Sequence, residues 1–327
     1  MRILFVTNMY PTLQRPDYGA FVWQQAEQLR RFGHTVDVVN ILGFRSKRNY
    51  LKGAVDVLRR TSGTPYDVVH AHYGVSAFPA WVRLRAPLVM TLHGSDVLGG
   101  RFERLCSWLI SRLADAVIVV SEEMRQRVPG IVIPCGVDLK LFRPYNRDEA
   151  RARLGWPLDK SLILFPFDPK RPVKRYDLAK AAVERLAQEG ISAELMTVFG
   201  VENRKMPWYY SAADAMILCS DREGSPTSVK EALACNLPVV STDVGDVREI
   251  LSGVAGAWLS KREVGQIARN LREALDAPRC GRFERPAAMA RYDQALTVEK
   301  IISLYDKVLS EFKAKQRRLR SMESDVR

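Results

Sequence analysis

Short apolar runs alternate along the chain with segments whose apolar residues recur at helical spacing, and this alternation occurs in two successive blocks. In the first block, apolar runs predict five strands, at residues 3–6, 36–42, 67–71, 88–92 and 116–120. The segments between them predict helices at about residues 20–32, 51–60, 75–84, 102–113 and 121–127. Because strands that alternate with helices form parallel sheets covered on both faces, this block predicts one α/β domain.

The second block repeats the pattern after a join at residues 134–138. Its apolar runs predict strands at residues 162–165, 193–199, 215–218 and 238–241, with a short helix at 148–154 before them. A last helix, at about residues 287–315, carries an apolar stripe of 3.6-residue period, and the lysines and arginines at its end predict a frayed, solvated tail. We predict two Rossmann-like, doubly wound α/β domains facing a cleft, at residues 1–138 and 139–290, and a C-terminal helix with a basic tail at 291–327.

The stretch from Glu223 to Glu231 is the most informative candidate site in the chain. It follows the apolar run at residues 215–218, so it predicts a strand, a polar loop and the start of a helix. We expect Ser225 to be the N-cap and Pro226 the first helical residue, which leaves backbone N–H groups facing a bound anion such as phosphate. A carboxylate on each side suits a nucleotide sugar, because one can bind sugar hydroxyls and the other a ribose diol. Ser-Pro helix starts are common and most helical acids are solvated, so these residues alone leave a structural role open.

The composition narrows the choice of partners. Hydrophobic residues make up 47% of the 327 residues and charged residues 27%, as in globular proteins. A net charge of +13 favours an anionic partner, which could be nucleic acid, a nucleotide or an anionic membrane face. We expect no nucleic-acid partner, because no recognised module and no basic stretch interleaved with aromatics is present. No apolar run approaches the ~20 residues of a membrane span, and five scattered cysteines suit a reducing compartment. We therefore expect a cytoplasmic protein.

Several motifs together resemble the family-4 retaining glycosyltransferases of GT-B fold, over nearly the whole chain. The resemblance is carried by Glu223 and Glu231, by the join at residues 134–138 and by the closing long helix. It is closest to bacterial polysaccharide-assembly members of the teichuronic-acid type, on motifs at residues 7–11, 18–22, 70–74, 91–96 and 172–175. It implies a C-terminal helix that crosses back and a role in cell-envelope polysaccharide biosynthesis. The implied enzyme is a retaining hexosyltransferase that moves a sugar from a UDP- or GDP-linked donor to a hydroxyl of a glycan or lipid-linked acceptor.

The resemblance also implies roles for the residues of the donor site. Lys174 would bind the donor diphosphate as a point charge, and Arg175 beside it would either help or be a surface residue. Glu223 would hydrogen-bond the hydroxyls of the transferred sugar, and Glu231 would bind the ribose diol. The stretch that would supply backbone donors to sugar and phosphate is Gly224, Ser225, Pro226 and Thr227.

Residues of the first domain are implied as well. Gly19, in the loop after the first strand, would let backbone approach the phosphates without a side chain in the way. His93, at the carboxyl end of a strand, would lie at the sugar, or else be a structural histidine with its hydrogen bonds satisfied. We expect Asp96 to cap the helix that follows. We expect His70 and His72 to point to opposite faces of their strand, one toward the acceptor and the other into the core.

The chain departs from the family pattern just before Lys174. Many members carry a Gly-Arg pair there, whose arginine also contacts the diphosphate, but residues 165–171 place phenylalanine, proline and Asp168 in that stretch. Lys170 or Arg171 could supply the missing charge, and the sequence does not choose between them. This departure keeps two alternatives open: a catalytically impaired nucleotide-sugar-binding subunit, and a sugar-nucleotide epimerase of the same architecture.

The remaining expectations concern metals, cofactors and membranes. The chain contains no Asp-x-Asp diad, so we expect no metal and no cofactor beside the donor, with cationic side chains and a helix dipole neutralising the diphosphate. No G-x-G-x-x-G motif follows the first strand, which disfavours a dinucleotide-dependent oxidoreductase. The positive charge further predicts peripheral binding to an anionic surface, the inner face of the plasma membrane.

Overall fold

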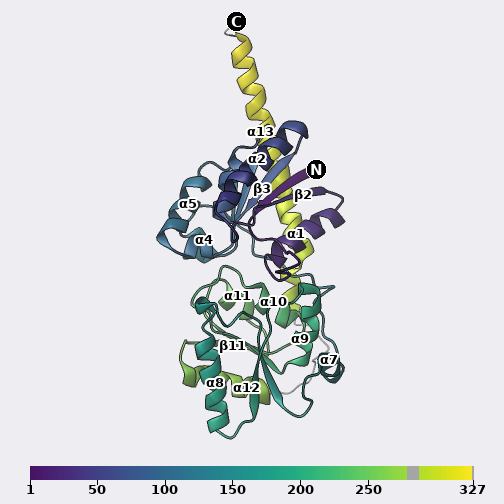
Figure 1. Cartoon of the computed structure of the whole chain (residues 1–327), viewed down its shortest axis with the longest axis vertical. Coiled ribbons are helices and arrows are strands. Elements are labelled where there is room, and N and C mark those ends of the chain that lie inside the picture. The colour runs from purple at the N-terminus through teal and green to yellow at the C-terminus, as the bar shows by residue number, and fades with distance from the viewer. Residues whose placement is uncertain (278–286, 326–327) are drawn as a thin grey trace. The chain divides into compact units, whose positions relative to one another are not determined.

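The computed structural model describes residues 1–277 and 287–325. The chain forms two compact α/β units (Figure 1). The first comprises Met1–Tyr10, Phe21–Pro134 and the C-terminal segment from Ala295, and the second comprises Pro11–Ala20 and Cys135–Gln294. Each unit is built on one parallel sheet, which confirms the predicted α/β class.

The first unit contains a six-stranded sheet with strand order β2-β1-β3-β4-β5-β6. Its strands are β1 (Arg2–Thr7), β2 (Thr35–Asn40), β3 (Val68–His72), β4 (Leu88–Leu92), β5 (Ala116–Val119) and β6 (Ile131–Val132). Its helices before the join are α1 (Ala20–Arg31), α2 (Arg48–Gly63), α3 (Ala77–Trp81), α4 (Ser95–Leu98), α5 (Arg101–Ser111) and α6 (Glu122–Arg125). Five strands match the predicted apolar runs. The sixth, β6, has only two residues, which is too short to produce a recognisable run.

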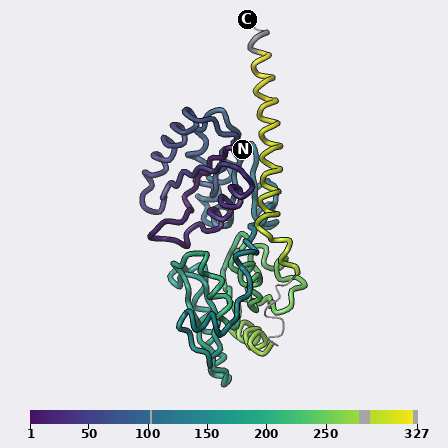
Figure 2. Tube along the Cα trace, turned by 90° about the vertical axis from the view of Figure 1, so that its right-hand side faces the viewer, coloured from purple at the N-terminus to yellow at the C-terminus, as the bar shows by residue number. Residues whose placement is uncertain are grey.

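The C-terminal helix α13 (Gln294–Asp325) belongs to the first unit and runs alongside it in Figure 2. Its apolar stripe, which includes Val298, Ile301, Tyr305 and Val308, packs in the same core as the strands of that unit. The predicted bounds of 287–315 are wrong at both ends, because residues Ala287–Tyr292 form the 3-10 helix η4 and α13 continues to Asp325. The basic run is helical because it contains strong helix formers and no glycine or proline.

The second unit contains a five-stranded sheet with strand order β11-β10-β9-β7-β8. Its strands are β7 (Ser161–Phe165), β8 (Ala193–Thr197), β9 (Ala215–Leu218), β10 (Val239–Thr242) and β11 (Ala257–Ser260). Its helices are α7 (Arg147–Leu154), α8 (Tyr176–Gln188), α9 (Met206–Ala212), α10 (Thr227–Ala234), α11 (Val247–Leu251) and α12 (Val264–Asp276). Helix α7 begins where Asn146 accepts hydrogen bonds from the N–H groups of Asp148 and Glu149, as an N-cap does.

Two apolar clusters fill the second unit. One joins α8 and α12 to side chains such as Ile163 and Val240, and the other joins α9, α10 and α11 to side chains such as Leu164 and Val239. Because successive residues of a strand point to opposite faces, these clusters cover the two faces of the sheet. Helices on both faces leave the carboxyl ends of the strands as the edge where loops can form a site.

Four cysteines, Cys106, Cys135, Cys219 and Cys235, are free, and Cys280 lies outside the described residues. Within residues 1–277 and 287–325, no helix is at once long enough and apolar enough to cross a membrane.

Candidate active site

Three loops at the carboxyl ends of adjacent strands bring the predicted donor residues of the second unit together. They follow β7, β9 and β10, which are neighbours in the sheet. The loop after β7 leads into the 3-10 helix η2 (Pro172–Lys174), and the loop after β9 leads into α10. The loop after β10 contains Gly245 and Asp246.

Lys174 and Glu223 form an ion pair, although they are 49 positions apart in the chain. Lys174 Nζ donates to Glu223 Oε1 at 2.5 Å, and the ammonium also lies 4.0 Å from the centre of the Phe167 ring. Both side chains are largely buried, with 7% of Lys174 and 16% of Glu223 exposed. Burial lowers the pKa of Lys174, and the carboxylate of Glu223 opposes that shift. The Lys174 ammonium is thus held between a carboxylate and an aromatic face at the carboxyl edge of the sheet.

The loop after β7 presents further cations beside Lys174. Asp168 closes a turn here, since its carboxylate accepts the N–H of Lys170 and its carbonyl accepts the N–H of Arg171. Arg171 is exposed and its positive charge lowers the pKa of Lys174, so the two cations are near one another. Arg175 has a left-handed backbone (φ 51°).

The guanidinium of Arg175 forms ion pairs with Asp177 at 2.7 Å and Asp221 at 3.3 Å. Hydrogen bonding to Asp177 raises the pKa of Arg175. Arg171 therefore has the more available charge of the two arginines, because Arg175 pairs with these two carboxylates.

The start of α10 differs from the prediction. The helix begins at Thr227, with Pro226 rather than Ser225 as its N-cap. Instead of capping the helix, the Ser225 hydroxyl donates to Asp246 Oδ2 at 2.7 Å and accepts from Lys230 Nζ. The backbone N–H groups of the first turn still lack intrahelical partners, as in any helix.

Gly224 belongs to the same loop and lies against the loop after β10. A Cβ atom on Gly245, whose φ is +59°, would lie 2.4 Å from the carbonyl oxygen of Gly224. Only glycine at position 245 allows the two backbones to approach this closely. The loop after β10 thereby packs directly against the backbone of the loop that carries Glu223 and Gly224.

Lys230 is a central residue of the site that the sequence analysis missed. Its side chain is 0% exposed, and its ammonium donates to the carbonyl oxygen of Cys135 at 2.8 Å, to Ser225 Oγ at 2.5 Å and to Asp246 Oδ2 at 3.2 Å. It also lies 4.7 Å from the centre of the Tyr292 ring. One buried ammonium thus joins α10, the loop after β9, the loop after β10 and the segment after the join. The sequence did contain a signal for this role, because Lys230 lies between the apolar residues of a predicted helix.

Glu231 is buried and doubly hydrogen-bonded. Tyr210 Oη donates to Glu231 Oε2 at 2.9 Å, and Asn203 Nδ2 donates to Glu231 Oε1 at 3.1 Å. Burial raises the pKa of Glu231 to about 7, although both hydrogen bonds lower it. The sequence analysis singled out Glu231 but neither donor. Tyr210 lies on α9, and Asn203 begins the 3-10 helix η3 (Asn203–Lys205).

In the first unit, His93 directly follows β4. Its Nε2 lies 3.1 Å from Nδ1 of His72, and its ring lies 4.7 Å from that of Phe21. The Nδ1 atom of His93 is buried without a hydrogen-bond partner among the described residues. Burial lowers the pKa of His93 to about 3, so the imidazole is neutral at physiological pH. Gly19, in the loop before α1 that is grouped with the second unit, has the positive φ (73°) that favours glycine.

The expectation that His70 and His72 point to opposite faces is wrong. Residues two apart in a strand share a face, and the two rings stack with centroids 4.2 Å apart. His70 is buried, with Nδ1 2.5 Å from Tyr305 Oη and Nε2 2.7 Å from Thr91 Oγ1. It therefore ties α13 to the sheet, while His72 contacts His93.

Asp96 does not cap the helix that follows. It lies inside α4, and its carboxylate accepts the backbone N–H groups of His93, Gly94 and Gly74. Burial raises its pKa to about 6, against the lowering effect of these hydrogen bonds. Asp96 thus fixes the backbone at the carboxyl end of β4. In the part of the chain that the structure describes, no group of three or more His, Cys, Asp or Glu could hold a metal ion.

Comparisons with known proteins agree in both units. The family model described as Glycosyltransferase Family 4 matches residues 18–141, and the one described as Glycosyl transferases group 1 matches residues 176–295. The Bacillus subtilis protein named teichuronic acid biosynthesis glycosyltransferase TuaC is 27% identical over 76% of this chain and 83% of its own length. The D-inositol 3-phosphate glycosyltransferase of Mycolicibacterium smegmatis is 27% identical over 77% of this chain and 70% of its own length.

Solved structures share the fold. Sucrose-phosphate synthase from Thermosynechococcus elongatus superposes with a TM-score of 0.75 at 19% identity, over 95% of this chain and 99% of that one. Anabaena HepE, solved in complex with UDP and glucose, superposes with a TM-score of 0.70 at 17% identity, over 94% of this chain and 100% of that one. The chain has the two Rossmann-like units of the GT-B fold, and with a family-4 domain followed by a group-1 domain it belongs to the family-4 glycosyltransferases.

Proposed function

We propose that this chain transfers a sugar from a nucleotide-sugar donor to a hydroxyl group, with retention of the anomeric configuration and without a metal or a resident cofactor. The observation that carries the proposal is the buried Lys174–Glu223 pair beside the start of α10, with buried Glu231 one turn into that helix. The similarity of fold to HepE, which has been solved with UDP and with UDP-glucose, supports a nucleotide sugar as the donor.

The donor would bind with each part on a different group. Lys174 and Arg171 would contact the diphosphate, together with backbone N–H groups of the first turn of α10 around Thr227. Glu231 would accept hydrogen bonds from the ribose diol, since each carboxylate oxygen keeps a free lone pair beside the bond from Tyr210 or Asn203.

Two other predicted groups would bind the reacting sugar. Glu223 would accept hydrogen bonds from sugar hydroxyls, and neutral His93 would contact the sugar through its unpartnered Nδ1 atom. When the diphosphate binds, the ammonium of Lys174 would donate hydrogen bonds both to Glu223 and to a phosphate oxygen. Gly19 would allow the backbone to approach the phosphates closely. Arg175 would lie at the edge of the donor site, held there by its ion pairs with Asp177 and Asp221.

The transfer itself would need little from the protein beyond position and charge. A bond forms between the acceptor oxygen and the anomeric carbon as the bond from that carbon to the phosphate oxygen breaks. The nucleoside diphosphate leaves with the electron pair and takes the acceptor proton on the same face. Lys174 and the N-terminus of α10 stabilise the negative charge that develops on the leaving group.

The acceptor would be a hydroxyl of a glycan or of a lipid-linked saccharide, in the assembly of a cell-envelope polysaccharide. The similarity to TuaC supports this class of acceptor. The net charge of +13 supports binding of the protein to the anionic inner face of the plasma membrane from the cytoplasm.

Thermal unfolding with UDP, GDP, ADP and their sugar conjugates tests the donor site. A nucleotide at ~100 times its Kd should add about 2.7 kcal/mol of stability to the wild type. Lys174→Ala should lose most of this increment. Lys180→Ala, an exposed lysine on α8, should keep it.

If none of these nucleotides stabilises the wild type, the proposed donor site does not exist. Release of free nucleoside diphosphate with the sugar attached to the acceptor distinguishes a transferase from an epimerase, which alters the donor without an acceptor.

A further inference from the structure

A pocket in the first unit is lined by none of the candidate site residues described above. It has a volume of about 290 Å³ and opens between α4, α5 and the segment after α6. Its walls include Arg101, Arg104, Leu105, Trp108, Arg127 and Val128. The elements that form it follow β4 and β5, so the pocket lies at the same edge of the sheet as His93. Ligands of parallel α/β sheets bind at this edge.

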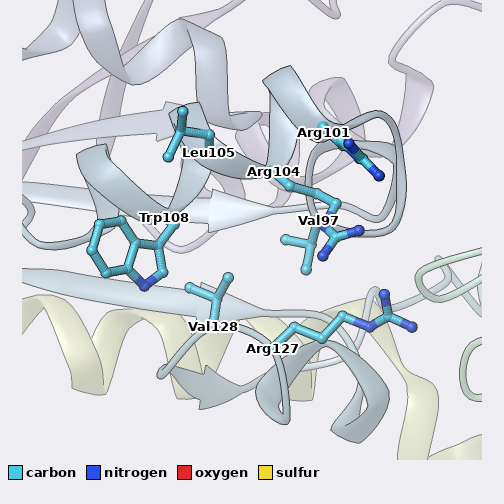
Figure 3. Close-up of a pocket in the computed structure, with 7 residues that line it drawn as sticks. All are labelled: Val97, Arg101, Arg104, Leu105, Trp108, Arg127 and Val128. Atoms are coloured by element: carbon cyan, nitrogen blue, oxygen red, sulfur yellow. The ribbon is translucent and has the colours of Figure 1, made fainter.

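The pocket has a basic side and an apolar side. In Figure 3 the guanidinium groups of Arg101, Arg104 and Arg127 gather at one side, and Trp108 and Leu105 lie at the other. A ligand that satisfies both sides must carry an anionic group next to an apolar one.

The charge of the basic side is not neutralised by the protein. Among the described residues, neither Arg101 nor Arg104 has an acidic partner, and Arg127 makes one contact of 3.4 Å to Glu123. Arg101 is also the first residue of α5, an 11-residue helix whose N-terminus adds positive potential. Glu103, in the same first turn, offsets part of it. Three guanidinium groups against two carboxylates leave a surplus that suits a phosphate or diphosphate.

The apolar side continues outside the pocket. Leu105, Leu109 and Leu113, spaced four residues apart, are 55%, 47% and 48% exposed, and Trp108 beside them is 39% exposed. The guanidinium of Arg112 lies 4.1 Å from the centre of a Trp108 ring. This apolar strip begins at the pocket wall and runs along α5 and the residues that follow it. A nucleotide or a sugar phosphate would fill the pocket and leave the strip exposed, whereas a long apolar chain would cover it.

We propose that this pocket binds the phosphate or diphosphate of the lipid-linked acceptor, with the lipid chain lying along Leu105, Trp108, Leu109 and Leu113. The inference rests on the proposed function, and it assigns the acceptor's anionic group to Arg101, Arg104 and Arg127. The pocket lies beyond the carboxyl ends of β4 and β5, so the bound anionic group would lie on the same side of the first unit as His93, the residue proposed to contact the sugar.

Isothermal titration of the full chain with farnesyl diphosphate, in the presence of saturating UDP, tests this site. UDP occupies the donor site, so the probe reports on the pocket alone. The double variant Arg101→Ala/Arg104→Ala should bind the probe at least tenfold more weakly, since about 1.4 kcal/mol is a factor of ten and each guanidinium makes a charged hydrogen bond. Arg125→Ala removes an exposed guanidinium that pairs with Glu122 on α6, outside the pocket, and should bind like the wild type.

The two halves of the ligand are tested separately with inorganic diphosphate and farnesol. Both should bind at least tenfold more weakly than farnesyl diphosphate. Trp108→Ala should weaken farnesyl diphosphate and leave inorganic diphosphate unchanged. Equal binding of farnesyl diphosphate by the wild type and the double arginine variant would overturn the proposal. So would inorganic diphosphate or farnesol binding as tightly as the intact probe.

The same titrations separate this proposal from the proposed function. UDP binding that Lys174→Ala weakens and the double arginine variant preserves supports the donor site whatever the probe does. Absence of binding of UDP, GDP and ADP in the wild type removes the proposed function, and the farnesyl diphosphate result still shows whether the pocket takes an anionic amphiphile.

Discussion

Lys230→Met should destabilise the protein more than any surface substitution, although the residue contacts no proposed substrate. Methionine keeps the volume of the side chain and removes the ammonium. The variant loses three hydrogen bonds, to the carbonyl oxygen of Cys135, to Ser225 Oγ and to Asp246 Oδ2. The substitution also removes the cation that pairs with Asp246, a residue whose side chain is only 1% exposed. The Oδ1 atom of Asp246 already has no hydrogen-bond partner among the described residues.

The magnitude follows from the uncompensated charge. Removing one member of a buried ion pair costs about 3–5 kcal/mol, because the other charge remains desolvated. For a unit of this size the loss corresponds to a Tm lower by about 6 °C or more. Lys180→Met removes an ammonium whose side chain is 61% exposed, in a surface pair with Glu184, and should change stability by less than about 0.5 kcal/mol.

Urea unfolding followed by far-UV circular dichroism measures both variants. The double variant Lys230→Met/Asp246→Asn tests whether the buried charge causes the loss of stability, because the asparagine amide is neutral and no unpaired charge remains buried. Its loss should be smaller than the sum of the two single losses by about 0.5–3 kcal/mol. A loss below about 1 kcal/mol for Lys230→Met, or strict additivity in the double variant, would refute the argument from the buried charge.

Three further predictions concern the donor site and the histidines. Lys174→Ala and Glu223→Ala should each lower turnover by about 10²-fold, the effect of losing one preorganised contact to the transition state, and steady-state kinetics near the wild-type rate would contradict these roles. Glu231 has a pKa of about 7 in the fold against 4.5 for the unfolded chain. Its stabilising contribution is therefore present below about pH 4.5 and is lost as the pH rises through about 7. Because the pKa rises from 4.5 to about 7 on folding, the wild type should lose about 3 kcal/mol more than Glu231→Gln over this range, measured by urea unfolding. In nitrogen-15 NMR, His70, His72 and His93 should remain neutral down to about pH 5, because burial lowers the pKa of all three. A protonation step near pH 6.5 at any of them would show a more solvated site.

Local pattern sufficed for most elements. The apolar runs located β1, β4 and β9 almost to the residue, because a buried parallel strand is apolar on both faces and needs no distant information to be recognised. The last helix shows the limit of that pattern. Its apolar stripe marks the face that packs against the first unit, but helix propensity alone carries α13 through the basic run to Asp325.

The candidate site was located by motif and completed only by the fold. The spacing of Glu223 and Glu231 and the position of Lys174 singled out all three residues. Nothing in that spacing predicts that Lys174 pairs with Glu223 or that Tyr210 donates to Glu231.

The wrong N-cap has the same cause. Ser225 is a good local cap, but a cap must turn its oxygen toward backbone N–H groups of the helix. In the fold the hydroxyl is instead placed between Asp246, to which it donates, and Lys230, from which it accepts.

The sequence by itself determined the order of strands and helices and the α/β class, because backbone periodicity is set by residues within a few positions of one another. Tertiary structure decided which polar groups meet. Lys230 reaches Cys135 across 95 positions and His70 reaches Tyr305 across 235. Such contacts depend on which elements become neighbours in the folded units, and buried polar groups must then find partners there because water is excluded.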